Sequence, residues 1–383
     1  MGFFYSGGGE RTVLNQAKGL MKKGHQVKVY APIIAKDCFP ELAKEVELVK
    51  ISKNVPESAP LKTALKMIDS SLQPPTKEFR DDEVIIAHGQ PSNWIAYRVS
   101  KKTGTPYVSY LHQANRFLHP REVDRKTGWK IDPSLAFLNL LHKGNSVIKK
   151  LDNISIKSST IILTNSNWIR LQIQQAYQKN SVICYPGVDI QKFKPTEKPT
   201  NDYILTTNRH IPQKRIDYLL TCIKKIKAKY PEIQCKITGE STPHTRELKE
   251  LRSKLQIEKN VTFTGKLSAE QLISAYQNAY TYAYTSPEED FGLGPLEAAA
   301  CKIPSIVWDH AGPRETVINE KTGFRVKPYD LDKMTEKHIL LLEDPPLREK
   351  MGKNAFKHVK SKFTWKHHCD RLEKVLESAL KHH

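Results

Sequence analysis

Residues 286–297, which read SPEEDFGLGPLE, decide the fold of this chain. The tyrosine-rich apolar run before them, residues 279–284, predicts a strand, and residues 296–301 predict the first turns of a small-residue helix. Glu289 is therefore expected in a strand-to-helix loop and Glu297 near the start of the helix, so both carboxylates can face one ligand. The glycines between them let backbone N–H groups come close to that ligand.

The pattern continues downstream of the two glutamates. It includes residues 298–307 (AAACKIPSIV), 309–317 (DHAGPRETV) and 322–324 (TGF). Two glutamates beside a glycine-rich turn can also be a solvated loop and a charge at a helix start. In this order, however, the segments resemble the glutamate-pair motif of glycosyltransferase family 4, whose members are retaining enzymes with the GT-B fold.

Strand and helix signals alternate along most of the chain. Apolar runs predict strands at residues 27–30, 46–51, 83–87, 107–111, 160–164, 182–185, 203–207, 234–238 and 261–264. This rhythm favours βαβ units and parallel sheets. The resemblance implies an α/β GT-B fold, in which two Rossmann-like domains have parallel sheets that face across a cleft. We expect an N-terminal acceptor-side domain at 1–192, a nucleotide-sugar donor domain at 193–362 and a C-terminal helix at 363–383 that returns to the first domain.

Length and composition are those of a soluble globular protein. The chain has 383 residues, with 39% hydrophobic and 27% charged, which suggests two domains. Its six cysteines show no C-x-x-C pair or metal spacing, so free thiols are expected. No run of about 18 apolar residues predicts a membrane span, and the start lacks a secretory signal.

The net charge of +20 favours an anionic partner. Residues 1–195 carry 29 of the 61 basic residues but only 16 of the 41 acidic ones, so the excess is concentrated in the N-terminal half. A nucleotide, a phospholipid surface, a lipid-linked phosphate and a nucleic acid would all fit. A nucleic-acid-binding protein would need a cationic face with interleaved aromatics or a recognised motif, and the sequence shows neither.

A glycine-rich turn opens the first predicted helix. Gly8 and Gly9 precede a helical pattern from residue 12 to residue 21, and such a turn can hold phosphate with backbone donors and the helix dipole. The spacing is not G-x-G-x-x-G, so it does not predict a dinucleotide site. The strand before it is short, and we therefore expect the natural chain to begin several residues earlier.

Two histidines follow predicted strands, where ligands gather in open α/β sheets. His88 follows residues 84–87 and His112 follows residues 108–111. A structural role is the simpler interpretation of an isolated histidine, and we keep it for His88. His112 stands where the family has its active-site histidine beside the donor sugar.

Arg209 and Lys214 lie in the loop after the predicted strand 203–207. Fixed cations in a dry cleft stabilise the charge that a sugar transfer leaves on a nucleoside diphosphate. Both could also be solvated charges at a helix start. The arginine and lysine of family 4 fall on these two positions, and the turn at Lys266 and Leu267 falls where the family packs the nucleobase.

The resemblance implies a role for each candidate residue. Arg209 and Lys214 would hold the diphosphate, Glu297 the donor ribose, Glu289 the sugar hydroxyls and His112 the sugar from the other side of the cleft. Further donor-binding positions would be Gly8, Gly9, Lys266, Leu267, Phe291, Gly292 and Leu293. No cofactor is expected other than the nucleotide-sugar co-substrate, and no metal is required because cations take its role.

The segments GGER (8–11), CF (38–39) and DFGLGPLE (290–297) are most similar to the α-1,3/1,6-mannosyltransferases that extend lipid-linked oligosaccharides. This similarity implies a GDP-mannose donor and a lipid-linked or cell-surface glycan acceptor. Asp290 departs from the glycine that is commonest in the family. A UDP-sugar donor with a soluble acceptor, a basic binding protein without enzyme activity and an inactive relative remain as alternatives.

Residues 116–150 interrupt the rhythm with a basic and apolar insertion. It contains eight basic and three acidic residues, together with Phe117, Trp129 and Phe137. A helical pair that covers the sheet is one interpretation. The other is an interfacial element that binds anionic lipid and leads to the acceptor site. We expect a cytoplasmic protein with peripheral contact to the cytoplasmic face of a membrane.

Overall fold

The chain folds into two compact units. Unit 1 comprises Met1–Gly187 and Trp365–His383, and unit 2 comprises Val188–Thr364. The computed structural model describes residues 3, 7–52, 55, 61–74, 76–79, 83–127, 133–142, 145–197, 199–200 and 202–381. The structure divides the chain at 187/188 and 364/365, close to the boundaries at 192/193 and 362/363 that the sequence predicts.

Unit 1 contains a four-stranded parallel sheet in the order β3-β4-β5-β6 and a separate parallel pair, β1-β2. The strands are β1 (Lys28–Ala31), β2 (Glu47–Lys50), β3 (Ile85–His88), β4 (Tyr107–Leu111), β5 (Ile161–Thr164) and β6 (Val182–Ile183). The helices of its first segment are α1 (Gly8–Met21), α2 (Pro40–Ala43), α3 (Lys62–Leu72), η1 (Thr76–Phe79), α4 (Ser92–Thr103), α5 (Glu122–Thr127), α6 (Pro133–His142), α7 (Ser146–Lys157) and α8 (Asn167–Tyr177).

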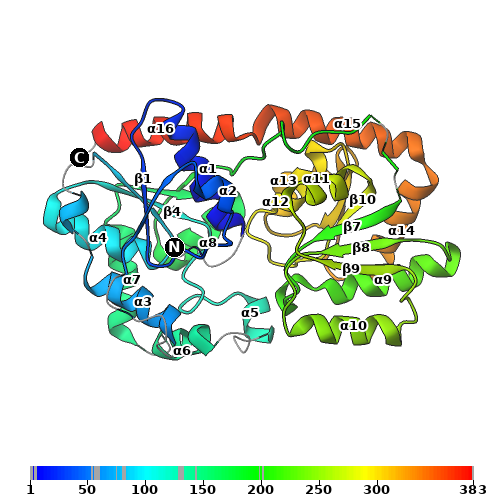
Figure 1. The fold of residues 1–383 in the computed structure, drawn as a ribbon, viewed down its shortest axis with the longest axis horizontal. Helices are drawn as coiled ribbons and strands as arrows, with labels where there is room; N and C mark the ends of the chain where they lie inside the picture. The colour runs from blue at the N-terminus through cyan, green and yellow to red at the C-terminus, as the bar shows by residue number, and fades with distance from the viewer. Residues whose placement is uncertain are drawn as a thin grey trace. The chain divides into compact units, whose positions relative to one another are not determined.

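The C-terminal helix α16 (Trp365–Lys381) belongs to unit 1. It packs against α1 and β4, as Figure 1 shows for α1. Leu372 and Leu376 of α16 join Leu20 of α1 and Tyr110 of β4 in one buried cluster. The last residues of the chain thus complete the core of the unit that its first residues begin.

Unit 2 contains a six-stranded parallel sheet in the order β12-β11-β10-β7-β8-β9. The strands are β7 (Tyr203–Thr207), β8 (Cys235–Thr238), β9 (Val261–Gly265), β10 (Ala279–Tyr284), β11 (Ser305–Trp308) and β12 (Gly323–Val326). The helices are η2 (Pro212–Lys214), α9 (Ile216–Lys229), α10 (His244–Lys254), α11 (Ala269–Gln277), α12 (Leu293–Ala300), α13 (Pro313–Thr316), α14 (Leu331–Glu343) and α15 (Pro345–Lys362).

Alternating residues of the central strands fill two cores. Ile204 of β7 packs with α9 and α10, whereas Tyr203 and Leu205 pack with α11 and α12, because successive side chains of a strand point to opposite faces. Figure 1 shows α9 and α10 on one face of this sheet and α11 and α12 on the other. Both units are therefore parallel, Rossmann-like α/β layers, as the strand and helix rhythm predicts.

Two helices begin earlier than the sequence predicts. Helix α12 starts at Leu293 instead of residue 296, because Gly292 adopts φ +96° as its N-cap and turns the chain into the helix. Helix α1 starts at Gly8 instead of residue 12, so Gly8 and Gly9 are its first two residues and Gly7 is its N-cap. Both helices therefore extend into what the pattern shows as loop.

None of the six cysteines forms a disulfide, as their spacing predicts, and all six are buried. In the part of the chain that the structure describes, no helix has both the length and the apolar character that crossing a bilayer requires.

Candidate functional site

Two loops of unit 2 carry the predicted cations and one of the predicted glutamates. β7 and β10 are neighbours in the sheet. Arg209 and Lys214 lie in the segment after β7, with Lys214 at the end of η2. Glu289 lies in the segment between β10 and α12. Since parallel strands end at one edge of a sheet, the two loops share the edge at which ligands of α/β proteins bind.

Hydrogen bonds to backbone carbonyl oxygens tie these loops to one another and to the rest of the sheet edge. The Thr285 hydroxyl donates to the Lys214 carbonyl oxygen at 3.1 Å, and the Trp308 indole N–H donates to the Thr285 carbonyl oxygen at 2.8 Å. The Gly312 N–H donates to the Glu289 carbonyl oxygen at 2.9 Å. The backbone on both sides of Glu289 is therefore held from β7 and from β11.

Gly312 is required for this approach. A Cβ atom at position 312 would lie 2.3 Å from Phe291 Cα, closer than non-bonded atoms come. Because the obstacle is backbone, no side-chain rotation relieves it. The predicted donor residues Phe291 and Gly292 are thus positioned partly by the segment after β11.

Lys214 and Glu289 form an ion pair. Lys214 Nζ lies 2.5 Å from Glu289 Oε2, and the two side chains are only 21% and 18% exposed. Such limited exposure makes the attraction stronger than that of a surface pair. Burial, with a further contribution from Glu289, raises the pKa of Tyr284 well above its usual value, so this neighbour stays uncharged.

Glu297 is a buried carboxylate. Only 4% of the residue is exposed, and its Oε2 accepts a hydrogen bond of 2.7 Å from the Tyr276 hydroxyl of α11. Phe291 is also buried and lies 5.8 Å from the Phe363 ring, whereas Leu293, at the start of α12, is half-buried. The hydrogen bond from Tyr276 offsets part of the cost of burying the Glu297 carboxylate.

The turn after β9 also reaches this sheet edge. The Gly239 N–H, after β8, donates to the Gly265 carbonyl oxygen at 2.9 Å. Lys266 is exposed, and Leu267 packs against the buried cluster of α11 and α12. Both predicted nucleobase-side residues therefore follow a strand end in the same unit as the cations and the glutamates.

Unit 1 holds the remaining predicted residues, Gly8, Gly9 and His112. Gly8 is exposed and Gly9 half-buried in the first turn of α1, where backbone N–H groups have no partner within the helix. His112 follows β4, and its Nε2 lies 3.3 Å from Nδ1 of His88 after β3. One ring therefore donates to the other.

The histidine pair is held in its neutral form. Burial, helped by the charge of His368, lowers the pKa of His112 to about 3, and burial also lowers the pKa of His88 well below its usual value. His368 of α16 is fixed between Gln16 and the Tyr185 carbonyl oxygen at 2.8 and 2.6 Å. His88 was expected to be structural. Its contact with His112 was not predicted, although the matching strand ends could have indicated it.

A buried carboxylate that the sequence did not single out organises the loops of unit 1. Asp152 of α7 is 1% exposed. Its Oδ1 accepts hydrogen bonds from Gln90 at 2.6 Å and Asn115 at 3.0 Å, and its Oδ2 accepts one from Tyr177 at 2.8 Å. Gln90 lies in the loop after His88 and Asn115 in the loop after His112. Asp152 therefore ties together the loops that carry both histidines.

Part of the insertion at 116–150 pairs within the fold. Asp124, whose side chain is fully buried, pairs with Arg116 and with Arg121, the latter at 3.2 Å. Although burial acts in the opposite direction, the hydrogen bonds and charges of these arginines lower the pKa of Asp124. Two of the cations expected at a lipid surface thus stabilise the fold instead.

Other residues of the insertion remain on the surface. Lys149 and Lys150 of α7 are exposed, as are the apolar side chains of Val147 (74%) and Leu140 (69%). Trp129, Lys130 and Lys143, which also carried the lipid-surface prediction, lie outside the described residues.

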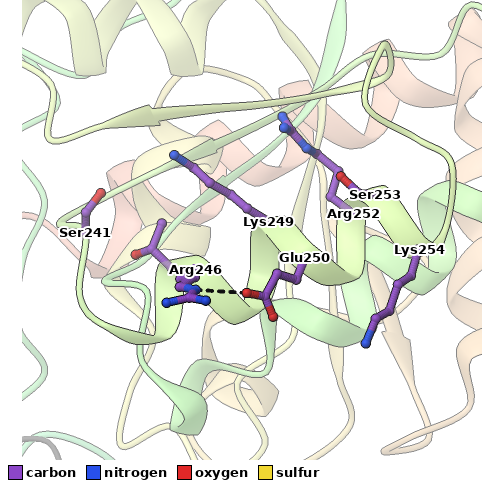
Figure 2. Close-up of a pocket in the computed structure, with 8 residues that line it drawn as sticks. Ser241, Arg246, Lys249, Glu250, Arg252, Ser253 and Lys254 are labelled. Atoms are coloured by element: carbon purple, nitrogen blue, oxygen red, sulfur yellow. Dashed lines mark hydrogen bonds and ion pairs between the residues drawn. The ribbon is translucent and has the colours of Figure 1, made fainter.

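A separate basic hollow lies on α10. It has a volume of about 790 Å³, and Figure 2 shows Lys249, Arg252 and Lys254 around it, with Arg246 paired to Glu250 at 2.9 Å. Its lining residues include none of the predicted site residues. The hollow is therefore distinct from the strand-end site.

No group of three or more His, Cys, Asp or Glu side chains in the described parts of the chain is arranged to hold a metal ion.

Family models match both halves of the chain. The model described as Glycosyltransferase Family 4 matches residues 6–192, and that described as Glycosyl transferases group 1 matches residues 187–358. The second match includes every predicted site residue of unit 2.

Curated relatives include mannosyltransferases. The chain is 31% identical over 212 residues to the GDP-mannose-dependent monoacylated alpha-(1-6)-phosphatidylinositol monomannoside mannosyltransferase of Corynebacterium glutamicum, which covers 50% of this chain and 55% of that protein. It is 22% identical over 407 residues to the alpha-1,3/1,6-mannosyltransferase ALG2 of Homo sapiens, with 98% and 94% covered. The chain thus spans little more than half the length of the first relative.

Solved structures show the same fold. Sucrose-phosphate synthase from Thermosynechococcus elongatus aligns with a TM-score of 0.80 at 18% identity, covering 98% of this chain and 94% of that one. Anabaena HepE in complex with UDP and glucose aligns with a TM-score of 0.77 at 18% identity, covering 97% and 96%. The fold class is that of the GT-B glycosyltransferases, as the motif implied.

Proposed function

This chain belongs to glycosyltransferase family 4, and we propose that it transfers a sugar from a nucleotide donor to an acceptor hydroxyl with retained configuration. The observation that carries the proposal is the Lys214–Glu289 ion pair at the shared edge of β7 and β10. It brings a cation suited to a diphosphate and a carboxylate suited to sugar hydroxyls to one place.

The proposed reaction breaks the bond between the sugar C1 and the diphosphate oxygen. The acceptor oxygen forms the new bond to C1, the nucleoside diphosphate leaves with the electron pair, and the acceptor's proton passes to the leaving diphosphate or to solvent. Arg209 and Lys214 stabilise the charge that develops on the leaving group without solvent reorganisation. When the donor binds, Lys214 exchanges part of its contact with Glu289 for the phosphate, which frees the carboxylate to accept from sugar hydroxyls.

The other residues take binding roles in this proposal. Glu297 accepts from the donor ribose hydroxyls, and Lys266 and Leu267 contact the nucleobase. Gly8 and Gly9 present N–H groups to the diphosphate, while the neutral His112 donates or accepts a hydrogen bond at the sugar. Cations replace a metal ion, so no metal is required.

Mannose from GDP-mannose is the proposed donor, and a lipid-linked or cell-surface glycan is the proposed acceptor. The printed names of the relatives support this choice, since one is GDP-mannose-dependent and another is an alpha-1,3/1,6-mannosyltransferase. A UDP-sugar is the second candidate, because the structurally similar HepE holds UDP and glucose.

A peripheral position on the cytoplasmic face of a membrane would suit a lipid-linked acceptor. The exposed Leu140 and Val147, with Lys149 and Lys150 nearby in sequence, have the mixture of apolar and cationic groups that binds an anionic lipid surface. Arg116 and Arg121 are left out of this surface because they pair with Asp124.

The test is a panel of nucleotide sugars, including GDP-mannose, UDP-glucose and UDP-N-acetylglucosamine, scored for binding and for slow donor hydrolysis. We expect micromolar binding and hydrolysis with GDP-mannose, and loss of hydrolysis in Lys214→Ala. Preference for a UDP-sugar would replace the donor but keep the reaction. Binding of no nucleotide sugar by the folded protein would refute the proposed function.

A further inference from the structure

A series of three hydroxyl groups ends at the buried carboxylate of Glu297. The Tyr276 hydroxyl donates to Glu297 Oε2 at 2.7 Å and lies 2.6 Å from Thr207 Oγ1. Thr207 Oγ1 in turn lies 2.8 Å from the Tyr282 hydroxyl. Strands β7 and β10 and helix α11 each contribute one member, and α12 contributes the carboxylate.

The chemistry of the groups determines the direction of these hydrogen bonds. An ionised carboxylate only accepts, so the single proton of Tyr276 is used toward Glu297. Tyr276 must then accept from the Thr207 hydroxyl, and Thr207 must accept from Tyr282. All protons therefore point toward the charge, and each hydrogen bond polarises the next.

The surroundings keep the three hydroxyls protonated. Tyr276 and Tyr282 are fully buried. Burial, and then the charge of Glu297, raises the pKa of Tyr276 well above its usual value; burial likewise raises the pKa of Tyr282. Cys301, one turn along α12, is buried beside Glu297, and burial raises its pKa too.

Helices α13 and α15 also pack on α12. Of their charged groups, Arg314 of α13 pairs with Asp309 at 3.0 Å, and Lys353 of α15 pairs with Glu349 at 2.6 Å.

Gly294 makes room for the Tyr282 end of the series. A Cβ atom at position 294 would lie 2.2 Å from the Tyr282 hydroxyl oxygen. The tyrosine thus lies directly against the backbone of α12, where only a glycine lets it reach Thr207. The same Cβ atom would also lie 2.9 Å from Tyr282 Cζ, so the hydroxyl end of the ring fills the space that the missing side chain leaves.

We propose that Tyr276, Thr207 and Tyr282 are positioning residues that orient Glu297 for nucleotide binding. The inference rests on the proposed function, in which Glu297 accepts hydrogen bonds from the donor ribose. A protonated or rotated carboxylate would bind ribose hydroxyls poorly. The hydroxyl series offsets the cost of desolvating the carboxylate, which burial alone would leave uncompensated.

The test measures GDP and UDP binding by calorimetry at pH 7. We expect Tyr276→Phe to weaken binding about tenfold, since it removes a hydrogen bond to a charge. Thr207→Val should weaken binding about threefold and Tyr282→Phe less than that, because their effect on the charge is relayed.

The chain offers matched controls. Tyr280 lies in the same strand as Tyr282 and is 2% exposed, and its hydroxyl has no hydrogen-bond partner among the described residues. Tyr280→Phe should leave the affinity for GDP and UDP unchanged. Thr207→Ser keeps the hydroxyl and should bind both nucleotides as tightly as wild type.

The possible outcomes distinguish a failure of the proposed function from a failure of the positioning proposal. If Glu297→Gln binds GDP and UDP as tightly as wild type, the ribose role in the proposed function is wrong. If Glu297→Gln weakens binding but Tyr276→Phe and Thr207→Val behave like Tyr280→Phe, the positioning proposal is wrong. If Tyr276→Phe fails to fold, the positioning proposal is tested instead by comparing the nucleotide affinity of Thr207→Val with that of Thr207→Ser.

Discussion

Replacing Lys214 by Ala should impair catalysis far more than it impairs stability. Preorganised donors of this kind contribute about 2.7–4 kcal/mol to the transition state, so turnover should fall about 10²–10³-fold. Arg209→Ala should have an effect of the same size if both cations hold the diphosphate.

The structure also sets the stability cost of Lys214→Ala. The variant leaves Glu289, which is 18% exposed, without its partner at 2.5 Å. A hydrogen bond between charged groups in such surroundings is worth about 1.5–3 kcal/mol. At roughly 2–4 °C per kcal/mol for a domain of this size, the melting temperature should fall by about 3–12 °C.

The assay is donor hydrolysis with GDP-mannose and UDP-glucose, measured well below the melting temperature of each variant. Lys225→Ala is the matched control, since Lys225 on α9 pairs with Asp332 at the same distance of 2.5 Å but with 39% and 87% exposure. It should cost about 0.5 kcal/mol or less and leave turnover intact. Turnover of Lys214→Ala within a factor of a few of wild type would refute the diphosphate role.

Three other predictions can be checked directly. Transfer should survive EDTA, and loss of activity that a divalent ion restores would contradict the metal-free mechanism. The protein should sediment with anionic but not with neutral liposomes, and raised salt should weaken this binding. The double variant Lys149→Glu, Lys150→Glu should bind anionic liposomes less without a change in donor hydrolysis. Equal binding to both liposome types would leave α6 and α7 with a structural role. The folded-state pKa of His368 is lowered to about 4, below the ordinary value near 6.5, so stability should be full above pH 6.5 and fall as the pH drops toward 4. His368→Gln should flatten that slope in pH-dependent unfolding, and an unchanged slope would exclude His368 as its source.

Local patterns in the sequence were sufficient for the strands. The predicted runs 107–111, 203–207 and 279–284 are β4, β7 and β10 to the residue, because a buried parallel strand is a continuous apolar run bounded by polar or glycine residues. Helix starts were less accurate. Gly8 and Gly292 lie at the starts of α1 and α12, and hydrophobic periodicity cannot tell a glycine that begins or caps a helix from one in a loop.

The motif likewise indicated the family, whose models match residues 6–192 and 187–358, and it supplied the candidate residues. The sequence did not predict what those residues contact. Lys214 and Glu289 are 75 positions apart and meet because β7 and β10 are adjacent, although β8 and β9 separate them along the chain.

The surroundings of the site also depended on long-range packing. Asp124 pairs with Arg116 and Arg121, although the residue types alone had suggested that these two arginines are surface cations. The Tyr282, Thr207 and Tyr276 hydroxyls reach Glu297 from three separate elements. Composition and periodicity determine which segments form strands and helices, because these depend on neighbours along the chain. Partners of charged and polar side chains depend on strand order and helix packing, and only the tertiary structure decides these.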